Sequence, residues 1–111
     1  PFAELGAHAA ALGMRFYTAH VFPGTFSHAI YVAEHGSWNR SKPIGYRIMF
    51  TSLKPDGTAD KTEIFADGFL DKETGIALGR PVDVAQMKDG ALLVSDDFAG
   101  AIYRISYRAP R

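Results

Sequence analysis

The sequence predicts an all-β fold. Short runs in which apolar and polar residues alternate recur along the 111 residues, and segments with Gly, Pro and Asp separate them. Alternation with a period of two places every second side chain on the same face of a sheet. About seven such runs can be distinguished, and no segment has a convincing helical pattern, so the fold is expected to consist of sheets.

The first segments combine one ambiguous stretch with two strands. Ala3–Leu12 is alanine-rich, which favours a short helix, although Gly6 interrupts it. Met14–Thr18 alternates and is predicted to be a strand with Met14, Phe16 and Thr18 on one face. Ala29–Glu34 is almost continuously apolar, which is typical of a strand that is covered on both faces.

The rest of the chain predicts further strands and the turns between them. In Tyr46–Thr51, alternation favours a half-buried strand with Tyr46, Ile48 and Phe50 inward. The turn residues lie in Phe22–Thr25, Lys54–Gly57, Lys88–Gly90 and Asp96–Gly100. The other expected elements are strands at Thr62–Phe69, Val82–Ala85, Ala91–Val94 and Ile102–Tyr107 and an irregular loop at Leu70–Gly79.

An internal repeat favours a β-propeller over a β-sandwich. Ala29–Glu34 is similar to Ala91–Asp96, 62 residues later, and Tyr46–Ile48 recurs as Tyr103–Ile105. Recurrence of one strand-turn-strand unit is typical of propeller blades, although their period is usually ~40–50 residues. Seven strands make fewer than two four-stranded blades. Because such a piece leaves sheet faces and edges open, we expect it to be unstable alone or to form a homo-oligomer.

Composition excludes several classes of function. Twelve Lys and Arg residues balance twelve Asp and Glu residues, so no net charge favours nucleic acid or an anionic membrane surface. No stretch approaches the ~20 apolar residues of a membrane span. The absence of cysteine excludes disulfides, thiolate nucleophiles and Cys-ligated zinc. Because the chain begins at Pro1, we expect it to be part of something longer.

The hexapeptide His35–Arg40 indicates a site. It follows an apolar strand and contains the only tryptophan, Trp38, with an imidazole, an amide and a guanidinium. Polar and aromatic groups gathered at a strand end favour ligand binding. The alternative is a hairpin connection in which Trp38 covers the edge of the core and Arg40 is solvated.

The motifs taken together resemble a known family. The matching segments are Gly13–Tyr17, His35–Arg40, Gly45–Tyr46, Arg80–Val84, Leu92–Asp97 and Ile102–Ile105. In this order they resemble the C-terminal part of the sugar dehydrogenases that depend on pyrroloquinoline quinone (PQQ), in particular the L-sorbosone dehydrogenase group and the related soluble glucose dehydrogenases. The resemblance implies that residues 1–111 form one domain, the C-terminal portion of a six-bladed β-propeller comprising about two blades. It also implies a loop, not a helix, over Ala3–Leu12.

The resemblance implies a quinoprotein oxidoreductase. Such enzymes oxidise a sugar or a sugar-derived aldehyde of the sorbosone or aldose type by hydride transfer to PQQ, and an electron acceptor then reoxidises the cofactor. They also bind calcium, with ligands outside the part that this chain matches, and they are periplasmic or secreted. Since their main base comes from an earlier blade, we expect this chain alone to be inactive. The alternative is a non-enzymatic binding or self-assembly module.

The resemblance also implies which residues contact the cofactor. The implied cofactor-binding residues are His8, Asn39, Arg40 and Arg80, and Trp38 would line the substrate pocket. Arg80 would bind the carboxylates and ring oxygens of the quinone, a role that suits a planar, permanently charged guanidinium. The sequence departs from the family at Asn39 and Val82, where the glucose enzymes have a lysine and a second arginine. Arg40 is a candidate to replace the missing lysine charge.

Other titratable residues fit structural roles better. His35 is a candidate proton shuttle near neutral pH, although the main base is expected elsewhere. Asp96 and Asp97 are adjacent on a strand end, so their side chains point to opposite faces, and turn capping is favoured over joint acid–base chemistry. His20 and His28 have no partner at metal-ligand spacing, so we expect no metal site in this chain.

Overall fold

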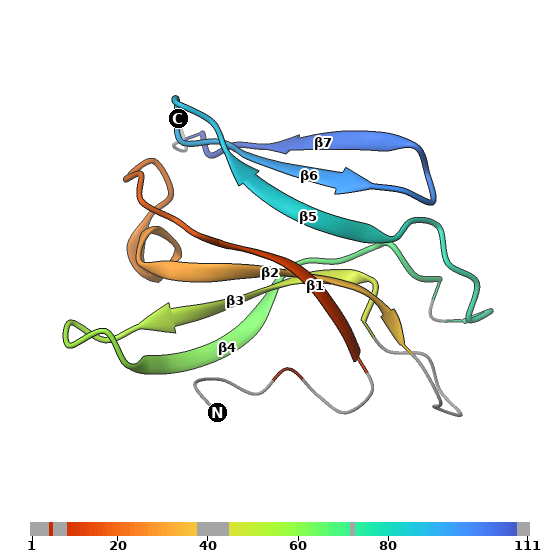
Figure 1. Ribbon diagram of the computed structural model, residues 1–111, viewed down its shortest axis with the longest axis horizontal. Coiled ribbons are helices and arrows are strands. Elements are labelled where there is room, and N and C mark those ends of the chain that lie inside the picture. Colours follow the sequence, from red (N-terminus) through yellow and green to blue (C-terminus); the bar gives the residue numbers. More distant parts are fainter. Residues whose placement is uncertain (1–4, 6–8, 38–44, 72, 109–111) are drawn as a thin grey trace.

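In the computed structural model, residues 5, 9–37, 45–71 and 73–108 are described, and they form two antiparallel sheets (Figure 1). Strands β1 (Ala9–Phe16), β2 (Ala29–Ser37), β3 (Arg47–Leu53) and β4 (Ala59–Ala66) form the first sheet in chain order. Strands β5 (Pro81–Gln86), β6 (Leu92–Asp96) and β7 (Ala101–Ile105) form the second. The one helical element in the described part is a 3-10 turn, η1 (Gly24–Ser27), so the all-β prediction is confirmed.

The two sheets repeat one unit, as the internal repeat predicted. Each sheet is an antiparallel meander, and β2 and β6 are the second strands while β3 and β7 are the third. The arrangement is that of two successive propeller blades packed face to face, the second with three of the usual four strands. The fold is therefore part of a β-propeller.

The expectation for Ala3–Leu12 was wrong in its described part. Residues 9–12 belong to β1, so neither the helix nor the loop extends across them. Ala9 pairs with Ser37 and Ala11 with Glu34. Pairing with β2 satisfies the backbone groups of this segment, and that gain outweighs the modest intrinsic preference of alanine for a helix.

Burial of the central strands agrees with one prediction and corrects another. β2 is covered on both faces, as predicted, because Tyr31, Val32 and Ala33 are all buried. β3 was expected to be half-buried, but Met49 and Thr51 on its second face are also buried. On this face, Met49 lies between its paired neighbours Val32 of β2 and Ile64 of β4.

An aromatic layer fills the space between the sheets. Tyr17, Phe22, Tyr31 and Phe50 lie on one side, and the buried aliphatic residues Val84, Leu92 and Val94 lie on the other. The Tyr17 ring stacks on Phe22 with 4.9 Å between centroids. Such pairs contribute about 0.5–1.5 kcal/mol beyond the burial of their area.

Two tyrosine hydroxyls of the aromatic layer donate to backbone oxygens. The Tyr17 hydroxyl donates to the carbonyl of Gly90, across the two sheets, and the Tyr31 hydroxyl donates to the carbonyl of Phe26. Burial, with a smaller effect of Tyr17, raises the pKa of Tyr31. The Tyr31 hydroxyl therefore stays a neutral donor, and the hydrogen bonds of both hydroxyls offset the cost of burying them.

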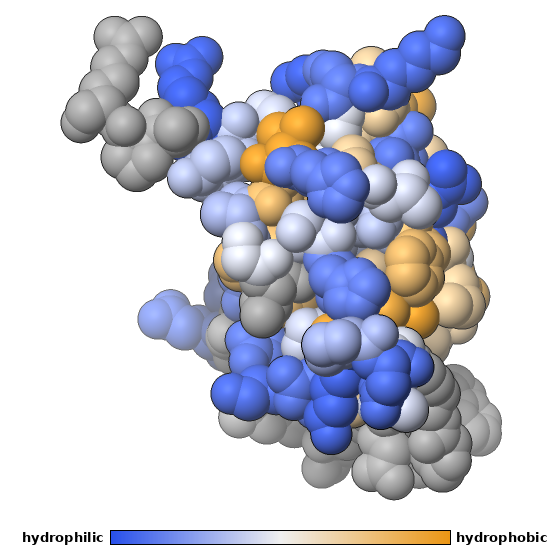
Figure 2. Space-filling view, turned by 90° about the vertical axis from the view of Figure 1, so that its left-hand side faces the viewer, coloured by the Kyte–Doolittle hydropathy of each residue, from blue (hydrophilic) through white to orange (hydrophobic). Residues whose placement is uncertain are grey.

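The outer face of the first sheet is open and apolar. Leu12, Met14, Phe16 and Ile64 are exposed large hydrophobic residues, and Met14 is 61% exposed. On the second sheet Ile102 is 72% exposed. By contrast, Figure 2 shows that hydrophilic side chains cover much of the edge with the β3–β4 and β5–β6 turns. Propeller blades cover such faces with neighbouring blades.

The inner strands β1 and β5 approach each other most closely at Gly13. A Cβ atom at Gly13 would lie 2.6 Å from the Cα of Asp83 and would also collide with the Asp83 carboxylate. This distance is far below van der Waals contact, so the position requires glycine although its backbone dihedrals do not.

We predict that Gly13→Ala lowers the free energy of unfolding of the full-length protein by about 1–3 kcal/mol, the usual cost of overpacking. Urea unfolding measures this change. Asp83→Ala in the Gly13→Ala background is the control, and it should not restore stability because the Asp83 Cα remains in the way. Unchanged stability of Gly13→Ala would show that the sheets are not in close contact here.

Candidate functional site

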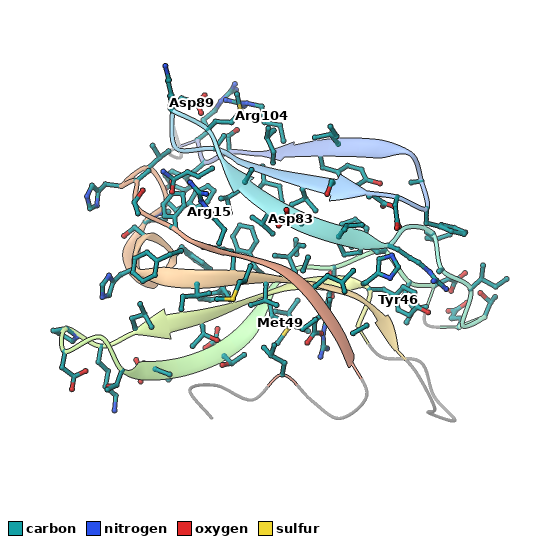
Figure 3. All side chains as sticks on the ribbon, viewed as in Figure 1. Arg15, Tyr46, Met49, Asp83, Asp89 and Arg104 are labelled. Carbon is teal, nitrogen blue, oxygen red and sulfur yellow. The ribbon has the colours of Figure 1, made fainter. Side chains whose placement is uncertain are left out.

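Three connections meet at one edge of the two sheets. The antiparallel pairing places the start of β1 opposite the end of β2, through Ala9 and Ser37, and the start of β5 opposite the end of β6, through Pro81 and Asp96. The β2–β3 connection, the segment before β5 and the β6–β7 turn therefore share this edge, which we call the site edge. In Figure 3, Tyr46 marks it, whereas Asp89 and Arg104 lie at the opposite end.

The structure places two of the predicted residues at the site edge. Arg80 directly precedes β5, and His35 lies in the last part of β2. The other predicted residues, His8, Trp38, Asn39 and Arg40, lie outside the described residues, so their roles stay predictions.

Asp96 fixes the backbone of Arg80. The Asp96 side chain is buried, and its Oδ1 accepts hydrogen bonds from the backbone N–H groups of Arg80 (2.9 Å), Phe98 (3.0 Å) and Ala99 (2.8 Å). Its Oδ2 accepts one from the Tyr103 hydroxyl. Turn capping by Asp96 is thus confirmed, and the same carboxylate also anchors the residue predicted to bind the cofactor.

The hydrogen bonds outweigh burial in setting the pKa of Asp96. Burial acts to raise this pKa, and the hydrogen bonds from Ala99, Arg80, Tyr103 and Phe98 act to lower it. The net result is a lowered pKa. The carboxylate therefore stays ionised and keeps accepting all four bonds at neutral pH.

The Arg80 guanidinium lies between two aromatic rings. Its Cζ is 5.6 Å from the centroid of the Tyr46 ring and 5.8 Å from that of the Phe98 ring. Both distances allow a cation–π attraction. Its Nε is buried and has no hydrogen-bond partner among the described residues. A buried donor without a partner is costly, so the arrangement is suited to an acceptor supplied from outside.

Glycines allow Tyr46 to reach Arg80. Tyr46 has a positive φ of 55°, and Gly45 before it has a φ of 90°. A Cβ atom at Gly36 would lie 3.1 Å from Cζ of the Tyr46 ring, so this ring packs directly on the backbone of β2. The Gly45–Tyr46 motif was visible in the sequence, but nothing local indicated that the ring would face Arg80.

His35 forms a hydrogen bond that connects the two sheets. Its Nε2 lies 2.9 Å from Oδ1 of Asp97, which follows β6. The His35 side chain is 22% exposed and that of Asp97 is 62% exposed. As expected, Asp96 and Asp97 do not act as a pair, since Asp96 accepts from the turn and Asp97 contacts His35. The bond to His35 was not predicted.

A second buried carboxylate belongs to Glu34, which precedes His35 in β2. Glu34 is fully buried, and its Oε1 accepts a hydrogen bond from Arg47 Nε at 2.6 Å. Its Oε2 is buried and has no hydrogen-bond partner among the described residues. Nothing in the sequence indicated this pair, because Glu34 ends an apolar run and only the register with β3 brings Arg47 opposite it.

The site can bind an anionic, planar group. A guanidinium donates parallel, charge-assisted bonds to carboxylates, and the flanking rings of Tyr46 and Phe98 hold it in place. Within the described ranges, no group of three His, Asp or Glu residues is arranged to hold a metal ion. None of the helices in these ranges is long and apolar enough to cross a membrane.

Two sequence comparisons found similar proteins. A family model described as TrAA12-like matches residues 1–108. An uncharacterised protein of Borreliella burgdorferi is 46% identical over 107 residues, which cover 94% of this chain and 27% of that protein.

Two solved structures share the fold. The calcium structure of a Trichoderma reesei carbohydrate-active enzyme of family AA12 superimposes with a TM-score of 0.73 at 21% identity, over 90% of this chain and 25% of that one. The holo PQQ domain of pyranose dehydrogenase from Coprinopsis cinerea gives a TM-score of 0.59 at 28% identity, over 90% of this chain and 27% of that one. The chain thus spans about a quarter of the length of these relatives.

The lowered pKa of Asp96 yields a prediction about stability in acid. Its ionised form contributes stability that is present above the ordinary aspartate value of 3.8 and is lost as the pH falls through the lowered pKa. At neutral pH we expect Asp96→Asn to lower the free energy of unfolding by about 1–3 kcal/mol, because an amide cannot accept all four bonds. The difference from wild type should shrink below pH 3.8.

Urea unfolding of the full-length protein at neutral and acidic pH measures both effects. Asp89→Asn is the matched control, since Asp89 also has a lowered pKa, due first to a hydrogen bond from the Ala91 backbone, but lies exposed at the opposite end. Equal effects of the two substitutions would contradict a special role for Asp96.

Proposed function

This chain belongs to the TrAA12-like family, and on that basis we propose that the full-length protein is a quinoprotein oxidoreductase dependent on PQQ. The observation that carries the proposal is the Arg80 guanidinium, held between Tyr46 and Phe98 with a buried Nε–H that lacks a partner among the described residues. The PQQ domain of pyranose dehydrogenase, with which the chain shares its fold, supports the choice of cofactor.

The described residues fit such a cofactor. PQQ is a planar, polycarboxylated quinone, and Arg80 offers a fixed positive charge with an unused donor beside two aromatic faces. When bound, the quinone accepts a hydride from the substrate and later passes electrons to an acceptor. The share of this chain is to bind and orient the cofactor, through Arg80 and, in keeping with the sequence resemblance, through His8, Asn39 and Arg40.

Asp96 determines where Arg80 can donate. Its Oδ1 holds the Arg80 backbone N–H, so the guanidinium departs from a fixed point before β5. The rings of Tyr46 and Phe98 then restrict the guanidinium from two sides. Preorganisation of this kind lowers the entropy cost of holding the cofactor.

The finer features of the activity follow the sequence resemblance. We propose a sugar or sugar-derived aldehyde of the sorbosone or aldose type as substrate, with Trp38 lining its pocket. We also propose a calcium ion with ligands outside residues 1–111, which the calcium-bound AA12 structure supports. A periplasmic or secreted location and a separate electron acceptor complete this proposal.

We predict that Arg80→Ala weakens PQQ binding by the full-length protein ~10- to 100-fold, the value of one or two charge-assisted hydrogen bonds. Arg80→Lys should recover only part of the affinity, because an ammonium cannot donate two parallel bonds. Titration with PQQ in the presence of calcium, followed by absorbance, measures the change. Arg104→Lys, at the opposite end beside Asp89, is the matched control.

Two results would separate the parts of this proposal. Failure of the wild-type full-length protein to bind PQQ would reject the quinoprotein assignment. Binding without reduction of the quinone when sugars and sorbosone are added would retain the cofactor and reject the substrate class.

The open sheet face favours a second proposal for the chain by itself, namely self-association as a non-enzymatic module. Exposed Leu12, Met14, Phe16 and Ile64 form an apolar surface on the first sheet. We predict that the purified 111-residue chain has a light-scattering mass above that of the 12.1 kDa monomer. Met14→Lys combined with Ile64→Lys should reduce this mass, and a monomeric wild-type chain would contradict the proposal.

A further inference from the structure

We propose that His35 and Asp97 form a clamp between the two blades that sets the spacing of the aromatic walls around Arg80. The inference concerns positioning and not proton transfer. Its consequence for the cofactor rests on the proposed function, whereas its consequence for the local structure does not.

On the first sheet, the clamp is coupled to the Tyr46 wall. His35 is followed by Gly36, and the Tyr46 ring packs against the backbone of Gly36. The Tyr46 ring in turn lies 5.6 Å from Cζ of Arg80. A displacement of the end of β2 would therefore move this wall relative to the guanidinium.

On the second sheet, the clamp is coupled to the Phe98 wall. Asp97 lies between Asp96, which anchors the Arg80 backbone, and Phe98, whose ring is 5.8 Å from the guanidinium. Asp96 also accepts the backbone N–H of Phe98. The His35–Asp97 bond thus links the strand end that contacts Tyr46 to the turn that contains Phe98. Arg80 contacts both of these rings.

In the part of the chain that the structure describes, no strand ladder joins the two sheets, so side-chain contacts hold them in register. At the end opposite the site edge, the Gln86 side chain accepts the backbone N–H of Thr18 and Ala19 and donates to the Thr18 hydroxyl. At the site edge, the hydrogen bond between His35 and Asp97 joins the two sheets. Hydrogen bonds thus connect the blades at both ends, and the His35–Asp97 bond is the one near Arg80.

The chemistry of the pair suits a permanent clamp. A carboxylate accepts hydrogen bonds, so His35 Nε2 must carry a proton to bind Asp97. That requirement is met both by the neutral ring protonated at Nε2 and by the imidazolium. Because the two residues are 62 positions apart, their bond restricts the two blades and not a local turn.

The experiment is a double-mutant cycle in the full-length protein with two measurements. His35→Phe, Asp97→Ala and the double variant are compared with wild type. His35→Gln serves as the conservative variant, since the glutamine amide can donate from a similar position. The first measurement is backbone hydrogen exchange of segments 45–47 and 97–100 without PQQ, and the second is the affinity for PQQ.

We expect both single variants to increase exchange in these two segments and to weaken PQQ binding by ~3- to 30-fold, within the usual range of coupling between contacting side chains. The double variant should bind PQQ with an affinity no lower than that of the single variant with the lower affinity. His35→Gln should recover most of the affinity and of the protection from exchange.

Gln86→Leu is the matched control because it removes the Gln86 hydrogen bonds to Thr18 and Ala19 at the opposite end, while the hydrogen bond from Tyr17 to Gly90 remains. It should lower overall stability without increasing exchange at residues 97–100. Unchanged exchange in His35→Phe, additive effects in the double variant, or an equal effect of Gln86→Leu at residues 97–100 would each overturn the clamp. If wild-type protein does not bind PQQ, the proposed function fails, and hydrogen exchange still decides whether the clamp exists.

Discussion

Face-to-face packing of two sheets that share no hydrogen-bonded ladder is the constraint on which the other features depend. The aromatic layer around Tyr17 and Tyr31 supplies most of the contact, and the hydrogen bond from Tyr17 to Gly90 fixes one sheet over the other. The close approach at Gly13 shows how little space remains between the inner strands. Because each connection at the site edge leaves one of these sheets, the geometry of the site is a direct consequence of this packing.

Buried carboxylates determine what that edge can bind. The Asp96 carboxylate accepts four hydrogen bonds from within the protein, and one of them comes from the backbone N–H of Arg80. Arg80 is then left with a buried donor and two aromatic neighbours. Glu34 is also buried, and among the described residues Arg47 compensates one of its two oxygens. Burial of charge is costly unless it is compensated, so these groups favour an edge with a defined arrangement and a bound partner.

Under the proposed function, the two blades form part of a quinoprotein site, and other blades form the rest. The chain spans about a quarter of its relatives, and its outer faces carry exposed residues such as Met14 and Ile102. Under the proposed function, these blades supply Arg80 and its supports, while the main base and the calcium ligands come from elsewhere. This division makes affinity for the cofactor, more than turnover, the property to measure in variants of these residues.

The sequence by itself determined the strands, most of the turns, the repeat of one unit and the position of Arg80 before β5. These features are local, because alternation and turn residues act over a few positions. Tertiary structure decided the rest: that Ala9 begins a strand, that Met49 is buried, and that His35 meets Asp97. Those outcomes depend on register and on the contact of two sheets, which join residues tens of positions apart. No short pattern encodes such distances, and the Arg80 site is therefore readable only once the blades are packed.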